Sequence, residues 1–325
     1  MLNIAIIGCG QIGSRHLQAL ATMKQGAIFY LVDSSNQSIE TSKKRFKEAV
    51  TQNDKSKFEI KVRKIDKIEC DLDFAIISST SSSRAMLTER LLSCTKVKYI
   101  IFEKFLFQNK NDYRNIQNLL KEKKVKAWVN QWMSSSIPFK EMAEWFGPDL
   151  EEITIVGQNW GMGCNSVHYL EYLDEISGRR GLTVTESNLD SKVIESKRPG
   201  YYELTGSVTI KSETGIKMTL VSENLETDGI VNFQMTGKSK GLEATLSNEI
   251  LKCNYDNKLS GKTSKEYTIQ LQSEKTGDIV EGISNDGSCA LPTYGQSMKQ
   301  HLMIFDCFQS VFKKQFKLSN TCPIT

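Results

Sequence analysis

The chain has 325 residues, with 42 Lys and Arg against 38 Asp and Glu, a formal net charge of +4, and 39% hydrophobic residues. This length exceeds what one hydrophobic core usually supports, so we expect two domains. The small net charge excludes a dedicated nucleic-acid binder, which carries a strongly basic stripe, and no stretch approaches the ~20 apolar residues of a membrane span.

The N-terminus and the cysteines indicate a cytoplasmic protein. The first residues lead directly into an apolar, strand-like segment, without the basic region and cleavage site of a signal peptide. The eight cysteines are spread along the chain with no C-x-x-C spacing, which is typical of free thiols in a reducing compartment. With only three histidines and no cluster of Cys and His, we expect no metal site.

A glycine-rich turn follows the first apolar segment. Residues 3–7 are a short β-branched run, and Gly8-Cys9-Gly10-Gln11-Ile12-Gly13 leads into residues with helical spacing. In such a strand–turn–helix, the first glycine permits the tight turn, the second lets the backbone approach a pyrophosphate, and the third lets helix and strand pack closely. The helix N-terminus favours the phosphates. We therefore predict a dinucleotide site with contacts from Gly8, Gly10, Gln11, Ile12 and Gly13.

Asp33 ends the second predicted strand, residues 27–32, twenty residues after Gly13. An acid there accepts hydrogen bonds from both hydroxyls of the adenosine ribose and repels a 2′-phosphate. Ser34 and Ser35 follow, with no arginine directly after them. We expect NAD as the cofactor, with NADP as the alternative. A strand-end turn acid that binds no ligand is the other interpretation of Asp33.

Further apolar strands are predicted at 73–78, 97–102 and 126–130, separated by helices at 85–93 and around 113–122. Short apolar strands alternating with helices predict a parallel sheet covered on both faces, and ligands bind outside the carboxyl ends of its strands. Residues at those ends complete the predicted cofactor site: Asp33, Ser79, Thr80, Glu103, Lys104 and Asn130. Residues 1–128 are therefore predicted to form an α/β Rossmann domain with a doubly wound parallel sheet.

The second half has a different pattern. A strand at 153–159 and a glycine-containing link at 160–166 precede a helix that carries His168. Residues 182–289 alternate apolar and polar side chains with turn signals between the runs, which predicts an open, largely antiparallel sheet. A helix follows at 293–314. We predict that residues 129–325 form an α+β domain for substrate binding and oligomerisation, with the C-terminal helix able to pack back on the first domain.

Lys104 and His168 are the candidates for chemistry. A histidine near a helix start, taken alone, is read as a residue that caps or packs the helix. Near a nicotinamide it becomes an acid/base, because oxidation of an alcohol by hydride transfer needs a group that titrates near neutrality to take the hydroxyl proton. A lysine lowers the energy of the alkoxide and orients the hydroxyl. We therefore predict Lys104 and His168 as the catalytic residues.

Together these residues resemble the glucose–fructose oxidoreductase, inositol dehydrogenase and MocA family (Gfo/Idh/MocA) over nearly the whole chain. The likeness rests on the G-x-G-x-x-G with His16 three residues on, on the strand-end Asp33, on Glu103-Lys104 as the start of the family's E-K-P motif, and on the helix histidine His168. It implies a Rossmann domain followed by an α/β domain with an open sheet, and activity on sugars, cyclitols and their derivatives.

The resemblance also implies roles for single residues. Lys104 would bind the reacting hydroxyl and the nicotinamide ribose, His168 would be the acid/base, and Asn130 would lie near nicotinamide and substrate. The stretch 159–168 is similar to members encoded with bacterial surface-glycan synthesis genes, which suggests an amino sugar, a nonulosonate precursor or a nucleotide sugar as substrate.

The sequence departs from the family pattern at several places. Phe105 replaces the proline of E-K-P, Ser79-Thr80-Ser81-Ser82-Ser83-Arg84 replaces the common T-P-N-x-x-H, and Cys164 stands where an aspartate is common four residues before the histidine. The arginine that often follows the asparagine strand is absent from 131–134. We therefore expect a standard cofactor site but distinctive substrate contacts, predicted from Asn130, Trp160, Cys164, Asn165 and His168.

These observations predict an NAD(P)-dependent oxidoreductase that transfers a hydride between nicotinamide and a hydroxyl or keto carbon of a sugar, amino sugar, nucleotide sugar or cyclitol. Two alternatives stay open: a non-catalytic, dinucleotide-binding regulatory protein of the same fold, and an enzyme that recycles its bound NAD within one turnover. The expected partners are a small-molecule substrate and further copies of the chain in a homodimer or homotetramer, because an open sheet leaves one face exposed. No nucleic-acid or membrane partner is expected.

Overall fold

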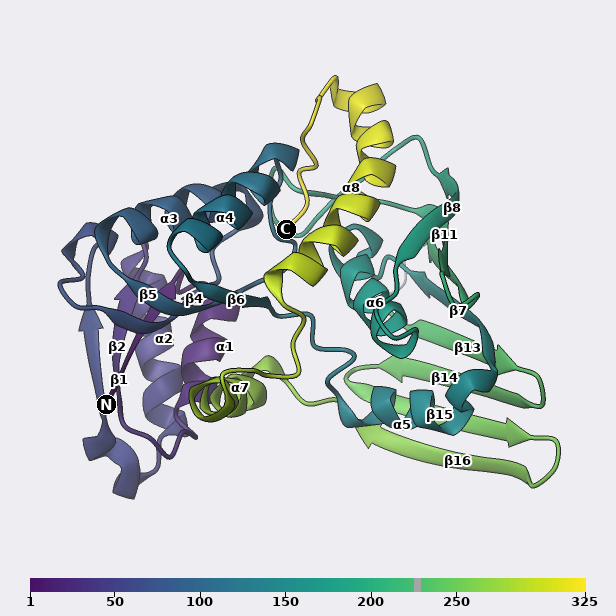
Figure 1. The fold of residues 1–325 in the computed structure, drawn as a ribbon, viewed down its shortest axis with the longest axis horizontal. Coiled ribbons are helices and arrows are strands. Elements are labelled where there is room, and N and C mark those ends of the chain that lie inside the picture. Colours follow the sequence, from purple (N-terminus) through teal and green to yellow (C-terminus); the bar gives the residue numbers. More distant parts are fainter. Residues whose placement is uncertain (225–228) are drawn as a thin grey trace. The chain divides into compact units, whose positions relative to one another are not determined.

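The computed structural model describes residues 1–224 and 229–325, which divide into two compact units. The N-terminal unit consists of Met1–Asn130, Gln270–Gln296 and Thr325, and the C-terminal unit consists of Gln131–Ile269 and Ser297–Ile324. Figure 1 shows each unit built around its own β-sheet.

The N-terminal unit contains a six-stranded parallel sheet in the order β3-β2-β1-β4-β5-β6. This is the doubly wound order, and it confirms the predicted Rossmann fold. The strands are β1 (Leu2–Ile7), β2 (Ala27–Val32), β3 (Phe58–Val62), β4 (Leu72–Ile77), β5 (Val97–Phe102) and β6 (Lys126–Val129).

Helices cover both faces of this sheet, as the continuous apolar strands require. In Figure 1, α1, α2 and α7 lie on one face, and α3 and α4 lie on the other. The helices are α1 (Gln11–Leu20), α2 (Asn36–Ala49), α3 (Ser81–Cys94), α4 (Lys110–Glu122) and α7 (Gln272–Asp286), with short 3-10 turns η1 (Gln52–Lys57) and η2 (Ile65–Lys67).

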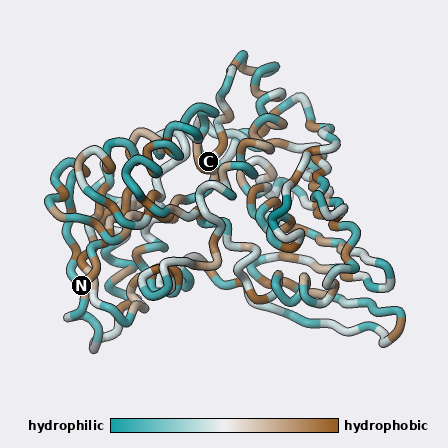
Figure 2. Tube along the Cα trace, viewed as in Figure 1, coloured by the Kyte–Doolittle hydropathy of each residue, from teal (hydrophilic) through white to brown (hydrophobic). Residues whose placement is uncertain are grey.

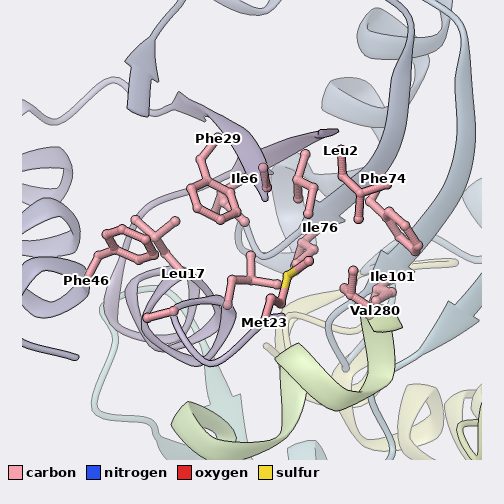
Figure 3. Close-up of a cluster of buried hydrophobic side chains, with 14 of the residues drawn as sticks. Leu2, Ile6, Leu17, Met23, Phe29, Phe46, Phe74, Ile76, Ile101 and Val280 are labelled. Atoms are coloured by element: carbon pink, nitrogen blue, oxygen red, sulfur yellow. The ribbon is translucent and has the colours of Figure 1, made fainter. Parts of the chain in front are cut away.

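A buried hydrophobic cluster joins the sheet to α1, α2 and α7 (Figure 3). Leu2, Ile4 and Ile6 alternate along β1 and point to this face. Phe29 of β2 contacts Phe46 of α2 edge to face, with ring centroids 5.2 Å apart. Other members come from α1 and α7: Leu17, Leu20, Val280 and Ile283.

The position of α7 differs from the predicted domain boundary. The sequence placed 182–289 in a β-rich region and 129–325 in one domain, but residues 270–296 belong to the N-terminal unit. Gly277, in the region where the sequence predicted strands and turns, lies where α7 packs on α1. A Cβ at this glycine would stand 2.8 Å from the carbonyl oxygen of Ala19 and 2.5 Å from Oγ1 of Thr22. The glycine therefore serves close helix packing and not a turn.

The C-terminal unit is built on an eight-stranded sheet in the order β16-β15-β14-β13-β7-β12-β11-β8. Only the β7–β12 pair is parallel among the pairings of the described residues, which confirms a largely antiparallel sheet. The strands are β7 (Leu150–Gln158), β8 (Leu182–Leu189), β11 (Gly206–Ser212), β12 (Lys217–Glu223), β13 (Val231–Gly237), β14 (Lys240–Ser247), β15 (Ile250–Asn257) and β16 (Gly261–Thr268), beside a two-stranded pair, β9 (Ile194–Glu195) and β10 (Tyr202–Glu203).

One face of this sheet carries the core of the unit. Ile153, Ile155, Met218 and Leu220 are buried and alternate with half-exposed residues along β7 and β12. Figure 2 shows the edge strand β16 as mostly hydrophilic. The helices are α5 (Ile137–Phe146), α6 (Met162–Ile176) and α8 (Tyr294–Phe316), with the short turn η3 (Gly147–Asp149). The predicted helix at 293–314 is α8. Within the described residues, none of the helices has the length and apolar character needed to cross a membrane.

Candidate cofactor and substrate sites

The glycine turn between β1 and α1 has the geometry that its sequence predicts. Gly8 has φ +95°, and a Cβ there would lie 2.6 Å from the backbone nitrogen of Ser79. A Cβ on Gly13 would lie 1.8 Å from the carbonyl oxygen of Gly8. By contrast, a Cβ on Gly10 would meet no described protein atom within 4 Å. Two glycines are therefore required by protein packing, while the third opens a space that a pyrophosphate can approach.

The N-terminus of α1 is suited to hold an anion. Gly10 is its N-cap residue and has no side chain to occupy the helix end, and the first turn contains no acidic residue. The N–H groups of Gln11 and Ile12 lie in this first turn and are directed toward the space at Gly10. The side-chain oxygen of Gln11 accepts a hydrogen bond from Nη2 of Arg45 at 3.1 Å.

The carboxylate of Asp33 binds the backbone of the glycine turn. Its Oδ2 accepts a hydrogen bond from the backbone N–H of Cys9 at 2.6 Å, and its Oδ1 accepts one from the N–H of Ser35 at 2.8 Å. Burial and the nearby charge of Asp33 raise the pKa of the Cys9 thiol to about 12, so Cys9 stays neutral. The carboxylate is thus fixed at the end of β2, where an adenosine ribose binds in a Rossmann fold.

The serine turn after β4 lies against the glycine turn. Oγ of Ser78 donates to the carbonyl of Gly8 at 2.7 Å. The hydroxyl of Ser79 is buried and has no hydrogen-bond partner among residues 1–224 and 229–325. Thr80 is the N-cap residue of α3, and its hydroxyl lies 3.1 Å from that of Ser82. The residues at this edge therefore fit a dinucleotide.

Glu103 is the centre of a buried hydrogen-bond network. Its Oε1 lies 2.9 Å from Nε2 of His16 and accepts a hydrogen bond from Nδ2 of Asn130, while Nδ1 of His16 lies 2.8 Å from the hydroxyl of Thr276 in α7. Burial would raise the pKa of Glu103. The hydrogen bonds from His16 and Asn130, the charge of His16 and the charge of Arg84 outweigh burial and lower this pKa. Glu103 is therefore ionised and tied to α1, β6 and α7.

Lys104 follows directly and is half-buried. The peptide bond between Lys104 and Phe105 is cis, although no proline follows. Arg84 donates hydrogen bonds to the backbone carbonyls of Phe105 and Leu106, the latter at 2.8 Å. Arg84 therefore holds the backbone that follows Lys104, where Phe105 stands in the place of the motif's proline.

The C-terminal unit contains a pocket of about 460 Å³ around His168. Its walls are mainly aromatic and amide side chains, with one lysine, contributed by Trp132, Met133, Asn159, Trp160, Asn165, His168, Tyr169, Lys197, Gly229, Val231 and Leu246. The structure therefore brings together three of the predicted substrate residues, Trp160, Asn165 and His168. Cys164 is not among the described residues that line the pocket.

The walls of this pocket are held by hydrogen bonds and ring contacts. Nε1 of Trp160 donates to the carbonyl of Val221 at 2.9 Å, and Nδ2 of Asn165 donates to the carbonyl of Trp160 at 2.8 Å. The ring of His168 lies 5.6 Å from that of Trp132, centroid to centroid. Gln131, the residue before Trp132, donates through Nε2 to the carbonyl of Val167 at 2.6 Å, which holds α6 against this segment. The pocket is thus largely preformed.

Cys164 was predicted to contact the substrate. It lies in the first turn of α6, beside Glu203. Its backbone N–H donates to Oε2 of Glu203 at 3.3 Å, and its thiol lies 3.5 Å from the carbonyl oxygen of Gly161. A Cβ on Gly163 would lie 2.7 Å from Oε2 of Glu203. A carboxylate therefore reaches the first turn of α6 from β10, although residue 164 itself has none.

Several residues in these sites were not found from the sequence. Trp132, Tyr169 and Lys197 line the pocket, and Thr276 contacts His16, but no local motif marks any of them. In the sequence, Arg84 was noted only because it replaces the histidine of T-P-N-x-x-H. Its contacts connect the turns at Ser79 and Phe105, which lie 26 residues apart, and one sequence cannot indicate such a link.

Comparisons with known proteins agree with this architecture. Three solved structures are similar along nearly the whole chain. An oxidoreductase from Agrobacterium radiobacter in complex with NAD⁺, L-tartaric acid and magnesium has a TM-score of 0.69 and 15% identity, covering 95% of this chain and 96% of its own. A putative myo-inositol dehydrogenase from Sinorhizobium meliloti 1021 has a TM-score of 0.66 and 16% identity, covering 97% and 98%. A UDP-N-acetylglucosamine 3-dehydrogenase from Acidithiobacillus ferrooxidans has a TM-score of 0.67 and 9% identity, covering 94% and 96%.

At these identities the similar structures show a shared fold. No curated protein sequence matches the chain. Residues 2–131 match the oxidoreductase family with an NAD-binding Rossmann fold, GFO_IDH_MocA. This segment contains the glycine turn, Asp33 and the Glu103 network, so the N-terminal unit is an NAD(P)-binding domain. Through residues 2–131 the chain is therefore similar to the Gfo/Idh/MocA family of NAD(P)-dependent oxidoreductases.

Proposed function

We propose that this protein transfers a hydride between NAD and a hydroxyl or keto carbon of a sugar, amino sugar, nucleotide sugar or cyclitol, with a role in bacterial surface-glycan synthesis. The observation that carries the proposal is the pocket around His168, where an imidazole lies among aromatic rings and asparagine side chains. Aromatic faces bind the C–H face of a sugar ring, and amides bind its hydroxyls. Such a pocket suits a polyhydroxylated substrate better than an apolar one.

Lys104 and His168 are proposed to handle the proton. When bound, the nicotinamide supplies the acceptor or donor of the hydride. His168 takes the hydroxyl proton during oxidation and returns it during reduction, because an imidazole titrates near neutrality. The ammonium of Lys104 orients the hydroxyl and stabilises negative charge on its oxygen. Glu103, Asn130 and His16 hold the backbone before Lys104 in place.

Asp33 supports NAD over NADP as the cofactor. Its carboxylate is fixed at the end of β2 by the N–H groups of Cys9 and Ser35. A 2′-phosphate placed there would meet this negative charge, whereas two ribose hydroxyls would donate to it. Our proposed substrate contacts are Trp160, Asn165 and His168, together with Asn130. We propose that Cys164 affects them indirectly, through its place in the first turn of α6.

Assembly through the eight-stranded sheet is proposed on the character of its second face. Thr154 and Val156 of β7 pair with Thr219 and Val221 of β12, and these four residues are only half-buried in the single chain. Small β-branched side chains at the centre of this face suit contact with another copy. We propose a homodimer or homotetramer, and light scattering of the purified protein tests this.

A sugar panel tests the proposed reaction. Purified protein is incubated with NAD or NADP and with sugars, amino sugars, nucleotide sugars and cyclitols, and formation of reduced nicotinamide is followed. We expect turnover with at least one class and a decrease of roughly 10²–10⁴-fold for Lys104→Ala and for His168→Ala. Turnover that survives both substitutions would contradict the assigned roles, and dinucleotide binding without redox change would favour a regulatory protein.

A further inference from the structure

Arg84 is a buried cation near the predicted catalytic lysine. It lies in the first turn of α3 and is only 2% exposed. Burial of a guanidinium is costly unless hydrogen-bond acceptors compensate for its lost hydration. Its backbone carbonyl accepts a hydrogen bond from the hydroxyl of Thr88 at 2.7 Å.

The guanidinium connects two turns at the carboxyl ends of β4 and β5. Nη1 donates to the carbonyls of Phe105 and Leu106, and Nη2 donates to the carbonyl of Ser79. All three acceptors are backbone groups, and Phe105 and Leu106 are fully buried. One planar fork therefore satisfies carbonyls that would otherwise lose hydration without compensation. An ammonium group is a point charge without this planar fork and does not reproduce the arrangement.

These contacts hold the backbone next to Lys104. The residue before it, Glu103, is held by His16 and Asn130, and the two residues after it are held by Arg84. Farther along, the hydroxyl of Tyr113 donates to the carbonyl of Phe107 at 2.9 Å. The backbone of Lys104 is therefore fixed on both sides, which determines where its side chain begins. The charge of Arg84 also favours the ionised form of Glu103.

We propose that Arg84 is a positioning residue, which holds the Lys104–Leu106 turn so that the Lys104 ammonium reaches the substrate hydroxyl. This inference rests on the proposed function of Lys104. It also links two departures from the family pattern. Phe105 stands in the place of the proline, and Arg84 stands in the place of the histidine. The carbonyl of Phe105 accepts a hydrogen bond from Arg84.

The test compares Arg84→Lys with Thr88→Val in the full-length protein bound to NAD. Both substitutions remove buried hydrogen bonds, but the bond made by the Thr88 hydroxyl stays within α3. We expect Arg84→Lys to lower kcat by roughly 10–100-fold, the size expected of a displaced catalytic group, while the Kd for NAD changes by less than about threefold. Thr88→Val should lower only the unfolding temperature. If Arg84→Lys does not fold, Arg84→Gln, which retains an amide donor, takes its place.

A spectroscopic readout makes the test independent of turnover. Lysines are reductively methylated with isotopically labelled formaldehyde, and the NMR signal of Lys104 is identified by its loss in Lys104→Arg. This signal should move in Arg84→Lys and stay in place in Thr88→Val. An unchanged signal and an unchanged kcat in Arg84→Lys would overturn the inference, as would an equal loss of kcat in Thr88→Val. If instead Lys104→Ala keeps its turnover, the proposed function of Lys104 fails, and the signal still decides whether Arg84 positions it.

Discussion

Oδ2 of Asp33 accepts a hydrogen bond from the backbone N–H of Cys9 at 2.6 Å, so the acid proposed to bind the ribose is joined to the turn proposed to meet the pyrophosphate. Replacement by alanine removes a charged acceptor that binds the turn and is proposed to bind the ribose. Hydrogen bonds to charged groups contribute about 1.5–3 kcal/mol, so we expect Asp33→Ala to weaken NAD binding by roughly 10–150-fold.

The same substitution removes the charge that opposes a 2′-phosphate, so NADP binding should weaken less or improve. Titration of protein fluorescence with each dinucleotide measures the two dissociation constants. An unchanged ratio of NADP to NAD affinity would show that Asp33 does not discriminate between them.

Gly10 and Gly13 provide a matched pair for the cofactor site. A methyl group on Gly10 would meet no described protein atom within 4 Å, whereas one on Gly13 would lie 1.8 Å from the carbonyl oxygen of Gly8. Gly10→Ala should change the free energy of unfolding by less than about 1 kcal/mol yet prevent close approach of the pyrophosphate. Gly13→Ala should destabilise the unit by about 1–3 kcal/mol. Thermal unfolding and NAD titration of both variants check this, and normal NAD affinity in Gly10→Ala would place the pyrophosphate elsewhere.

Helix α7 supplies a second pair, within one helix. Gly277→Ala would force a Cβ to within 2.8 Å of the Ala19 carbonyl oxygen, while a Cβ on Gly282 meets only the carbonyl oxygen of Ser288, at 3.8 Å. Gly277→Ala should therefore destabilise the N-terminal unit by about 1–3 kcal/mol. Gly282→Ala should stabilise it by up to about 1 kcal/mol through helix propensity. Equal effects of the two substitutions would contradict the packing of α7 on α1.

The lowered pKa of Glu103 predicts a pH dependence of stability. A carboxyl whose pKa is lower in the folded protein stabilises the fold above its ordinary pKa of 4.5, and this contribution is lost as pH falls through the folded value. Glu103→Gln should lower the free energy of unfolding near neutral pH by about 1–3 kcal/mol, with a smaller deficit as the solution is acidified below 4.5. The exposed Glu48→Gln serves as control. A deficit for Glu103→Gln that does not depend on pH would mean that Glu103 is not ionised in the folded protein.

The N-terminal sheet was predicted well because its strands are continuous apolar runs and its ligand-binding residues follow them directly. Gly8, Asp33, Ser79, Glu103 and Asn130 lie at the carboxyl ends of strands in the structure as predicted. Parallel alternation of strands and helices places such residues at one edge whatever the details of packing.

Other features depend on contacts that no local pattern contains. The hydrogen bond between His16 and Thr276 joins residues 260 positions apart. This bond and the apolar side of α7 hold that helix in the N-terminal unit. Cys164 was assigned to the substrate pocket from its spacing to His168, but its backbone binds Glu203, which comes from a different strand. In both cases the partner is fixed by tertiary structure.

The most direct test of the account is hydride transfer by the wild type and by two variants, followed as formation of reduced nicotinamide with NAD and the sugar panel. We predict that a sugar, nucleotide sugar or cyclitol reduces NAD in the wild type. We further predict that His168→Ala lowers kcat by roughly 10²–10⁴-fold while its Kd for NAD stays near that of the wild type, and that Lys104→Ala lowers kcat similarly. Tight NAD binding with no redox change for any member of the panel, or full turnover in both variants, would contradict the account.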